Sequence, residues 1–366
     1  MTRNAIKVLF VIDIAEIKHG YGTIGALANM AQRLSNNVQI TTYSVKPITG
    51  ISPQRLNATR IVCGLLTSIA SICRQIEIHN PDIIHIHGIW HLGVRVAKAA
   101  RIMNIPTVIS PHGMLHPFTL ENNKWKKKLF TMAFQFDAIS NATVIHALNL
   151  EEEGFIVNYV NKEKFREKCI IIPNGVEAIL EKNNQIDIKP INFLFCGQLS
   201  RRKRIELLLD SWNSANVSNR SQLIIAGSGP ENYKNELENV TRKIAGVKMI
   251  GFVSGEAKKM AFSSSHFGIL TSAGEGQPLA ILEALASGRP CITTPESCFP
   301  AIKSHNLGWI GKDQSELAEA IKCAVDLNDR EYCRLSDNSR EYVKKNHNWT
   351  TVADQFHDLY LKICGK

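Results

Sequence analysis

Long apolar segments are missing from this chain of 366 residues. No run of about 18 consecutive apolar residues occurs, so no segment is predicted to span a bilayer. The short apolar stretch near the N-terminus is followed directly by Asp13, Glu16 and Lys18, and it lacks the longer apolar region and cleavage site of a signal peptide. We interpret it as a buried first strand and expect the chain to stay in the cytosol.

Paired cysteines are also missing. None of the nine cysteines belongs to a C-x2-C pair, and most lie in stretches that are predicted to be apolar helices or strands. This pattern predicts reduced core residues rather than a disulfide framework or a zinc site. The cysteines occupy positions 63, 73, 169, 196, 291, 298, 323, 333 and 364.

An acidic residue is missing at the end of the second predicted strand, over residues 38–42. A nicotinamide site usually has such a residue to bind the ribose, so this class of site is not predicted. Gly20 and Gly22 follow the first strand in a glycine loop that opens a helix. The loop is either an ordinary tight turn or a place where the backbone approaches a bound group closely.

The composition is that of a globular protein, with 44% hydrophobic and 21% charged residues. The length fits two domains of roughly 150–200 residues each. The formal net charge of +10 indicates an acidic partner, which could be nucleic acid, a phosphorylated substrate or an anionic membrane.

Short apolar strands alternate with amphipathic helices along both halves of the chain, which predicts an α/β protein with two doubly wound parallel sheets of Rossmann-like topology. A polar segment over residues 177–190 is the predicted linker between domains over residues 1–176 and 191–348. The predicted strands of the first domain are 7–12, 38–42, 83–86, 107–110, 143–146 and 169–172, with helices near 24–34, 64–79, 91–103 and 124–139. Those of the second domain are 192–196, 222–226, 247–250, 268–270 and 290–293.

Two glutamates eight positions apart, Glu275 and Glu283, flank a predicted turn between a strand and a helix. Pro278 suits the first helical position, where a missing N–H has no cost. The free N–H groups of the helix start near Pro278 and Leu279 would then form an anion site, and the carboxylates would accept hydrogen bonds from sugar hydroxyls. The alternative is a surface turn with solvated glutamates.

A cluster of cations follows the first strand of the second domain. Gln198 lies in the turn, and residues 201–204 read Arg-Arg-Lys-Arg directly before a helix. Arg202 and Lys203 could bind a diphosphate, since Arg binds phosphate bidentately and Lys supplies a point charge. A solvated charge run is the alternative.

Three histidines lie at the ends of strands in the first domain. His85 and His87 share one face of a strand, which suggests either a metal site or structural and substrate-contacting groups. His112 lies between a proline and a glycine after the next strand, where we do not expect burial.

A basic and aromatic segment over residues 124–136 contains four lysines beside Trp125 and several phenylalanines. It could bind an anionic membrane surface. A solvated helix face with its apolar residues packed inward is the alternative.

In this order and at these spacings, the motifs resemble those of retaining glycosyltransferases of the GT-B fold, in particular family 4. The segment 272–290 is similar to the E-x7-E signature of that family, and residues 197–204 are similar to its pattern G-R-L-x-x-x-K-G, with Gln198 in place of Arg and Arg204 in place of Gly. The segments 82–87, 110–115, 172–176, 226–230 and 251–253 match further, weaker motifs, and the resemblance extends from residue 20 to about residue 308.

The resemblance implies roles for individual residues. Glu275 and His112 would contact the donor sugar, Lys203 and Arg202 would bind the diphosphate, and Glu283 would hold the ribose. Further donor-binding positions implied by the family motifs are Gly20, Gly22, Gln198, Gly229, Phe252, Pro278 and Leu279. The catalytic residues would be His112, Glu275 and Lys203, with no metal and no cofactor beyond the donor substrate.

The resemblance also implies a retaining, metal-independent transferase that uses a UDP- or GDP-sugar. Its acceptor would be a glycan, expected on a lipid carrier in bacterial surface polysaccharide or lipopolysaccharide synthesis, with membrane contact through 124–136 at the inner face of the plasma membrane and no nucleic-acid partner. The C-terminal helix over 349–366 would return to the first, acceptor-side domain. The alternatives are a nucleotide-sugar epimerase, a non-catalytic nucleotide-sugar-binding subunit, or a nucleic-acid-binding protein.

Overall fold

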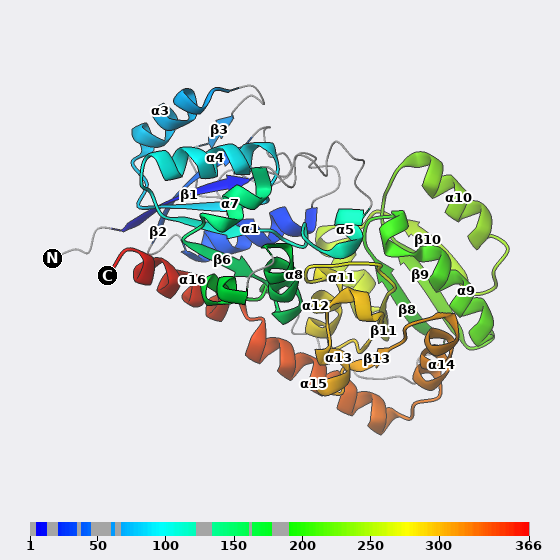
Figure 1. The fold of residues 1–366 in the computed structure, drawn as a ribbon. Coiled ribbons are helices and arrows are strands. Elements are labelled where there is room, and N and C mark those ends of the chain that lie inside the picture. The colour runs from blue at the N-terminus through cyan, green and yellow to red at the C-terminus, as the bar shows by residue number, and fades with distance from the viewer. Residues whose placement is uncertain are drawn as a thin grey trace. The chain divides into compact units, whose positions relative to one another are not determined.

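The computed structural model describes residues 5–12, 21–34, 38–44, 60–62, 67–121, 134–160, 163–177 and 190–365. The chain divides into two compact units (Figure 1). Unit 1 comprises Met1–Gly175 and Trp349–Lys366, and unit 2 comprises Val176–Asn348.

Unit 1 is built on a seven-stranded parallel sheet with the strand order β3-β2-β1-β4-β5-β6-β7. The strands are β1 Ile6–Ile12, β2 Val38–Ser44, β3 Arg60–Val62, β4 Ile83–His87, β5 Thr107–Ser110, β6 Val144–Ala147 and β7 Cys169–Ile171. The helices are α1 Tyr21–Leu34, α3 Ile69–His79, α4 His91–Ile102, α5 Pro117–Glu121, α7 Phe136–Ser140, α8 Leu150–Val160 and α16 Trp349–Ile363, with a 3-10 helix η3 at Glu163–Lys168.

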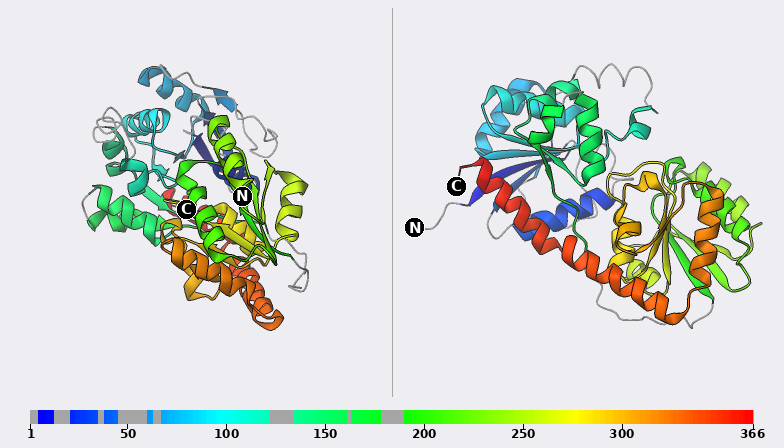
Figure 2. Two further views of the ribbon diagram at one scale, coloured as in Figure 1. Left: turned by 90° about the vertical axis from the view of Figure 1, so that its right-hand side faces the viewer. Right: turned by 60° about the horizontal axis from the view of Figure 1, so that its bottom comes forward.

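Helix α16 reaches unit 1 from the far end of the sequence and contacts α1 (Figure 2). Its apolar face, which includes the buried residues Trp349 and Phe356, supplies the packing energy. Gly175 is required where the chain passes this helix, because a Cβ atom there would lie 2.3 Å from the Trp349 ring.

Unit 2 is built on a six-stranded parallel sheet with the strand order β10-β9-β8-β11-β12-β13. The strands are β8 Ile191–Cys196, β9 Ser221–Ala226, β10 Val247–Gly251, β11 Phe267–Leu270, β12 Cys291–Thr293 and β13 Gly308–Ile310. The helices are α9 Ile205–Ala215, α10 Glu231–Thr241, α11 Gly255–Ser263, α12 Leu279–Ala286, α13 Ala301–Ser304, α14 Gln314–Val325 and α15 Asp329–Asn346, with 3-10 helices η4 Arg201–Lys203 and η5 Pro295–Ser297.

Helix α12 packs closely on the sheet of unit 2 because β11 carries a glycine beneath it. A Cβ atom at Gly268 would lie 2.7 Å from Cβ of Ala284. Beside this contact, the Phe193 and Phe267 rings stack with centroids 5.1 Å apart, and Trp212 meets Phe193 edge-on. This dense apolar core holds the helix start at a fixed place beside the carboxyl ends of the strands.

The prediction of two parallel, doubly wound sheets is confirmed. The sequence analysis did not find β3 and β13, which are three residues long and lack a continuous apolar run. The helix predicted over 64–79 begins, in the described residues, at Ile69 after the N-cap Ser68, whose side chain accepts a hydrogen bond from Ser71 N.

The prediction that the cysteines are core residues needs correction. Of the eight described cysteines, all free, Cys291 and Cys298 are buried, whereas Cys323 is exposed and the others are partly exposed, so most are not core residues. Gly20, residues 124–133 of the basic segment and residues 178–189 of the linker lie outside the described residues. Within the part of the chain that is described, we find no helix with the length and apolarity needed to cross a membrane.

Candidate functional site

The predicted diphosphate and sugar motifs of unit 2 meet at one edge of its sheet. Strand β8 leads through residues 197–200 into η4, and the neighbouring strand β11 leads through 271–278 into α12. Because β8 and β11 are parallel neighbours, both loops leave the sheet at its carboxyl edge, where α/β proteins bind ligands.

Lys203 and Glu275 form a buried ion pair in this edge. Lys203 Nζ lies 2.5 Å from Glu275 Oε1, and the two side chains are only 11% and 9% exposed. Arg202 adds a second cation, with its guanidinium 3.9 Å from Glu275 Oε2. The sequence analysis placed Lys203 and Glu275 at different parts of a ligand, and the structure brings them into direct contact.

Backbone contacts lock the two loops together. Ala273 N donates to the carbonyl of Arg202 at 2.7 Å, and Thr271 Oγ1 donates to the carbonyl of Lys203 at 3.0 Å. Arg204 donates from its guanidinium to the carbonyls of Thr271 at 2.9 Å and Ser272 at 2.8 Å. The Lys203–Glu275 pair therefore lies on a rigid frame rather than on two independent loops.

Arg204 explains a departure from the family pattern. Its backbone is left-handed, with φ 46° and ψ 48°, a conformation that favours glycine, which is the residue in the family motif. Besides the two carbonyls, its guanidinium binds Glu296 at 2.9 Å. These contacts compensate for the strained backbone, so Arg204 has a structural role here.

The Glu275 carboxyl group is ionised. Burial raises its pKa, but the charges of Lys203 and Arg202 and the hydrogen bond from Lys203 outweigh this effect, and the pKa lies below its usual value. Glu275 therefore presents a hydrogen-bond acceptor and not an acid.

The start of α12 differs from the prediction by one residue. Pro278 is the N-cap, with an extended backbone at ψ 107°, and the helix begins at Leu279. No side chain of the described residues caps this helix start. The first N–H groups of a helix have no intrahelical partner, so this end can bind an anion.

Glu283 lies one turn further along α12 and pairs with Lys258 of α11, with Nζ and Oε1 2.5 Å apart. The sequence analysis missed Lys258, because α11 is a polar helix whose lysines look like a solvated face. Cys196, the last residue of β8, lies near both charges, but burial is the larger influence and raises the pKa of its thiol to about 11.

The other predicted donor-binding residues of unit 2 surround this edge. Gly229 is required for packing, because a Cβ atom there would lie 2.1 Å from the carbonyl oxygen of Leu199. Gln198 is partly buried, and Phe252, which follows β10, is 55% exposed. By contrast, Arg201 points to another network, pairing with Glu206 and Glu236.

In unit 1, a directed chain of hydrogen bonds crosses the carboxyl ends of the strands. His146 Nε2 lies 2.7 Å from the carbonyl oxygen of Ile172, so this nitrogen carries the proton and donates. His146 Nδ1 must then accept from Ser110, whose oxygen accepts from His85 Nε2 at 2.8 Å, and His85 Nδ1 accepts from the Tyr360 hydroxyl at 2.7 Å. Both nitrogens of His85 are thus occupied, which rules out the metal-ligand interpretation of His85 and supports the structural one.

His112 lies beside this chain in a strained loop. Its backbone has φ 52°, in the left-handed region, and its Nε2 lies 3.2 Å from His87 Nδ1. Contrary to expectation it is partly buried; burial and the nearby His146 lower its pKa to about 3. Such non-glycine backbone outliers cluster at functional sites.

Glu152 holds the loop that carries His112, and the sequence analysis missed it. Its carboxylate accepts hydrogen bonds from Gly113 N at 2.6 Å and Leu148 N at 2.8 Å. Burial raises the pKa of Glu152 despite these two bonds. In the sequence it looks like an ordinary acid in the first turn of a helix.

Of the two predicted glycines after β1, Gly22 lies in the first turn of α1. Together with Gly20 and Gly25 it has the spacing G-x-G-x-x-G, so the glycines alone do not exclude a dinucleotide site. Strand β2 nevertheless ends at Ser44 without an acidic residue, and this is the feature that argues against such a site.

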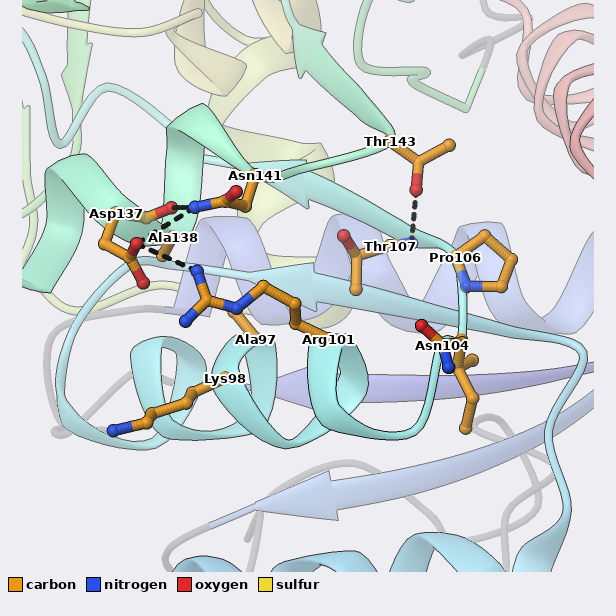
Figure 3. A pocket seen from close by; sticks show the side chains of 11 residues that line it. Ala97, Lys98, Arg101, Asn104, Pro106, Thr107, Asp137, Ala138, Asn141 and Thr143 are labelled. Carbon is orange, nitrogen blue, oxygen red and sulfur yellow. Dashed lines mark hydrogen bonds and ion pairs between the residues drawn. The ribbon is translucent and has the colours of Figure 1, made fainter.

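A cavity of about 310 Å³ in unit 1 lies away from these groups (Figure 3). Thr107 begins β5 and Thr143 precedes β6, so the cavity opens at the amino ends of these strands. Arg101 and Asp137, which pair at 3.0 Å, form another wall. Ligands of doubly wound sheets bind at the opposite, carboxyl edge.

Two doubly wound units with these groups at the carboxyl edges of their sheets define a GT-B glycosyltransferase. The family model "Glycosyltransferase Family 4" matches residues 29–178, and "Glycosyl transferases group 1" matches residues 190–326. The chain therefore belongs to glycosyltransferase family 4, a retaining family that uses nucleotide-sugar donors.

Individual relatives agree with this assignment. The chain is 24% identical over 320 residues to the UDP-Gal:α-D-GlcNAc-diphosphoundecaprenol α-1,3-galactosyltransferase of Escherichia coli, covering 81% of this chain and 80% of that protein. It is similar in fold to Anabaena HepE in complex with UDP-glucose, with a TM-score of 0.78 and 16% identity over 97% of this chain and 99% of the other. It is also similar in fold to WaaG, a glycosyltransferase involved in lipopolysaccharide biosynthesis, with a TM-score of 0.72 and 14% identity over 97% and 99%.

Proposed function

We propose that the protein transfers a hexose from a UDP- or GDP-sugar to a hydroxyl of a lipid-linked glycan, with retention of configuration. The observation that carries this proposal is the buried Lys203–Glu275 pair beside the uncapped start of α12. A cation, a hydrogen-bond acceptor and helix N–H groups therefore lie within one small region of unit 2.

The diphosphate would bind to Lys203, Arg202 and the first N–H groups of α12. During transfer, negative charge develops on the leaving nucleoside diphosphate. Preorganised cations and N–H groups stabilise such charge most where water is excluded, and Lys203 is largely buried. With this charge supplied by side chains and the helix, we expect the reaction to proceed without a divalent metal.

The sugar would bind to the other side of the same pair. Glu275 is held ionised and accepts hydrogen bonds from sugar hydroxyls, while Lys203 lies between it and the diphosphate. The bond that breaks joins the sugar to the β-phosphate, so it should lie where these two subsites meet. The contact between Lys203 and Glu275 supports such a junction.

The remaining donor contacts are proposed by position. Glu283 would hold the ribose, and the backbone around Phe252 would cradle the base. Gln198 and the loop of Gly229 would line the nucleotide.

In unit 1, Gly20 and Gly22 would face the diphosphate and the acceptor, and His112 would hydrogen-bond the donor sugar near its reacting carbon. Since burial keeps His112 neutral, it would orient the sugar without adding charge. A front-face path, in which the departing diphosphate takes the acceptor's proton, needs no dedicated base.

A lipid-linked acceptor is supported by the name of the Escherichia coli relative, whose acceptor is a diphosphoundecaprenol derivative. The basic segment 124–136 and the net charge of +10 would favour an anionic membrane. Lipid-linked acceptors of this kind are used in surface polysaccharide synthesis, where we place the reaction.

Donor binding tests the proposal. UDP-glucose, UDP-galactose and GDP-mannose are added separately, and the melting temperature and the Kd are measured for the wild type, Lys203→Met and Arg201→Met. We expect one donor to stabilise the wild type. Lys203→Met should weaken the binding of that donor at least about 30-fold. The variant removes the cation that would pair with the diphosphate, and removing one partner of a buried charge pair costs about 2–5 kcal/mol.

Arg201→Met is the matched control, because Arg201 lies in the same 3-10 turn but binds Glu206 and Glu236. Its donor affinity should stay within about twofold of the wild type, as for other exposed charges. Equal weakening in both variants would mean that general charge, and not this site, binds the donor. Donor binding without any transfer would favour the non-catalytic subunit.

A further inference from the structure

The ion pair between Lys258 and Glu283 joins two helices at the carboxyl edge of the unit 2 sheet. Lys258 belongs to α11 and Glu283 to α12, and the side chains are 33% and 27% exposed. The proposed function gives a role to Glu283 alone.

Part of this pair's hydrogen-bonding capacity is unused. Lys258 binds Oε1 of Glu283, and no other group of the described residues makes a hydrogen bond or ion pair with that carboxylate. Oε2 therefore remains an acceptor, and the ammonium group of Lys258 retains further N–H donors. Because both side chains are partly exposed, a ligand can reach them.

A hydrogen-bond acceptor directly beside a hydrogen-bond donor matches a vicinal diol. Each hydroxyl of a ribose can donate and accept, so one hydroxyl can donate to Glu283 while a neighbouring oxygen accepts from Lys258. Lys258 also neutralises Glu283. Without it, the carboxylate would repel the negatively charged nucleotide that has to bind at the same edge.

We propose that Lys258 is a specificity-determining residue that reads the ribose hydroxyls of the donor nucleotide together with Glu283. The inference rests on the proposed function, because it requires a ribonucleotide at this edge of unit 2. It goes further in assigning the recognition of ribose to a lysine–glutamate pair.

Binding of UDP, 2′-deoxy-UDP and 3′-deoxy-UDP by calorimetry tests this role, with the corresponding guanosine compounds if the wild type binds GDP instead. We expect the wild type to bind UDP about tenfold more tightly than at least one deoxy analogue, as for the loss of a hydrogen bond to a charged group. Lys258→Met should bind UDP about tenfold more weakly and lose most of that discrimination. Lys258→Arg, which keeps the charge, should retain part of both.

Lys259→Met is the matched control. Lys259 is the next residue of α11, is 59% exposed and pairs with Glu256. It should bind UDP and the analogues like the wild type. Melting temperatures of all variants, measured without nucleotide, show whether each one is folded under the conditions used.

The outcomes separate the two levels of the proposal. Unchanged UDP affinity and discrimination in folded Lys258→Met would overturn the role of Lys258, as would equal losses in Lys258→Met and Lys259→Met. Failure of UDP and GDP to bind the wild type would instead overturn the proposed function itself.

Discussion

The two units have the same central strand order but opposite chemistry at the carboxyl edges of their sheets. In unit 1 this edge carries neutral histidines joined by hydrogen bonds, and in unit 2 it carries ion pairs. The sheet alone therefore does not decide what an edge binds. The side chains that follow equivalent strands do, and they should make the two units respond differently to pH and to mutation.

Acid is expected to have the largest effect, and mainly on unit 1. Burial lowers the pKa of His85 and His87 well below the usual 6.5, of His146 to about 4 and of His112 to about 3. Below pH 6.5 the unfolded chain takes up protons that the folded unit does not. Each such histidine then reduces the free energy of unfolding by about 1.4 kcal/mol per pH unit, or about 2 kcal/mol at pH 5.

Acid should reduce the free energy of unfolding of unit 2 by less. His266, with its pKa lowered to about 4, is the counterpart in unit 2 of the histidines that lose stability in unit 1. The lowered pKa of Glu275 gives stability that persists until the pH falls below about 4.5. In unit 1, the raised pKa of Glu152 offsets part of the loss, because the folded state then takes up a proton. Hydrogen exchange of peptides from each unit at pH 7 and pH 5 measures the difference, and equal losses in both units would contradict it.

The second effect separates a buried from an exposed ion pair in unit 2, through the carboxylates of Glu275 and Glu296. Glu275→Gln leaves the buried Lys203 without its partner, so it should lower the free energy of unfolding by about 3 kcal/mol. Glu296, which pairs with Arg204, is 40% exposed, so Glu296→Gln should cost about 1 kcal/mol or less. Urea unfolding of both variants measures this contrast.

Glu275→Gln should also reduce turnover more than donor affinity, because the carboxylate would contact the sugar at the reacting centre. The kcat and the donor Kd of the variant show this directly. Unchanged turnover would remove Glu275 from the reacting centre, and similar unfolding free energies for Glu275→Gln and Glu296→Gln would remove the distinction between buried and exposed pairs.

The smallest effect concerns the loop of His112. Glu152→Gln replaces one of two accepting oxygens by an amide group that cannot accept from the backbone, so it should cost unit 1 about 1–2 kcal/mol. Glu151→Gln, at the adjacent and less buried position, should be near neutral. Affinity for UDP, whose proposed ribose and base contacts lie in unit 2, should not change in either variant, and thermal unfolding with nucleotide titration checks both statements.

Much of the fold was predictable because strands buried on both faces appear as apolar runs. Strands β5 and β8 were placed to within one residue on this signal. Strand β13 was missed because its three residues, Gly308–Ile310, are only half-buried and follow a short helix. Pro278 was placed one residue too far into α12, because proline is preferred at the first helical position and here it occupies the N-cap instead.

The site was predictable as a set of motifs but not as a set of contacts. Lys203 and Glu275 could each be placed after a strand, yet their pairing joins residues 72 positions apart and depends on β8 and β11 being neighbours. Lys258 and Glu152 could not be found, because a lysine or glutamate on a helix usually lies in solvent. Their partners come from other elements, and these become visible only in three dimensions.

A crystal structure of the full chain with UDP tests the central claim most directly. We predict that the β-phosphate lies within hydrogen-bonding distance of Lys203 Nζ and of the first N–H groups of α12, with the ribose at Glu283. UDP bound elsewhere, for example in the cavity between Arg101 and Thr143, with Lys203 contacting Glu275 alone, would contradict it.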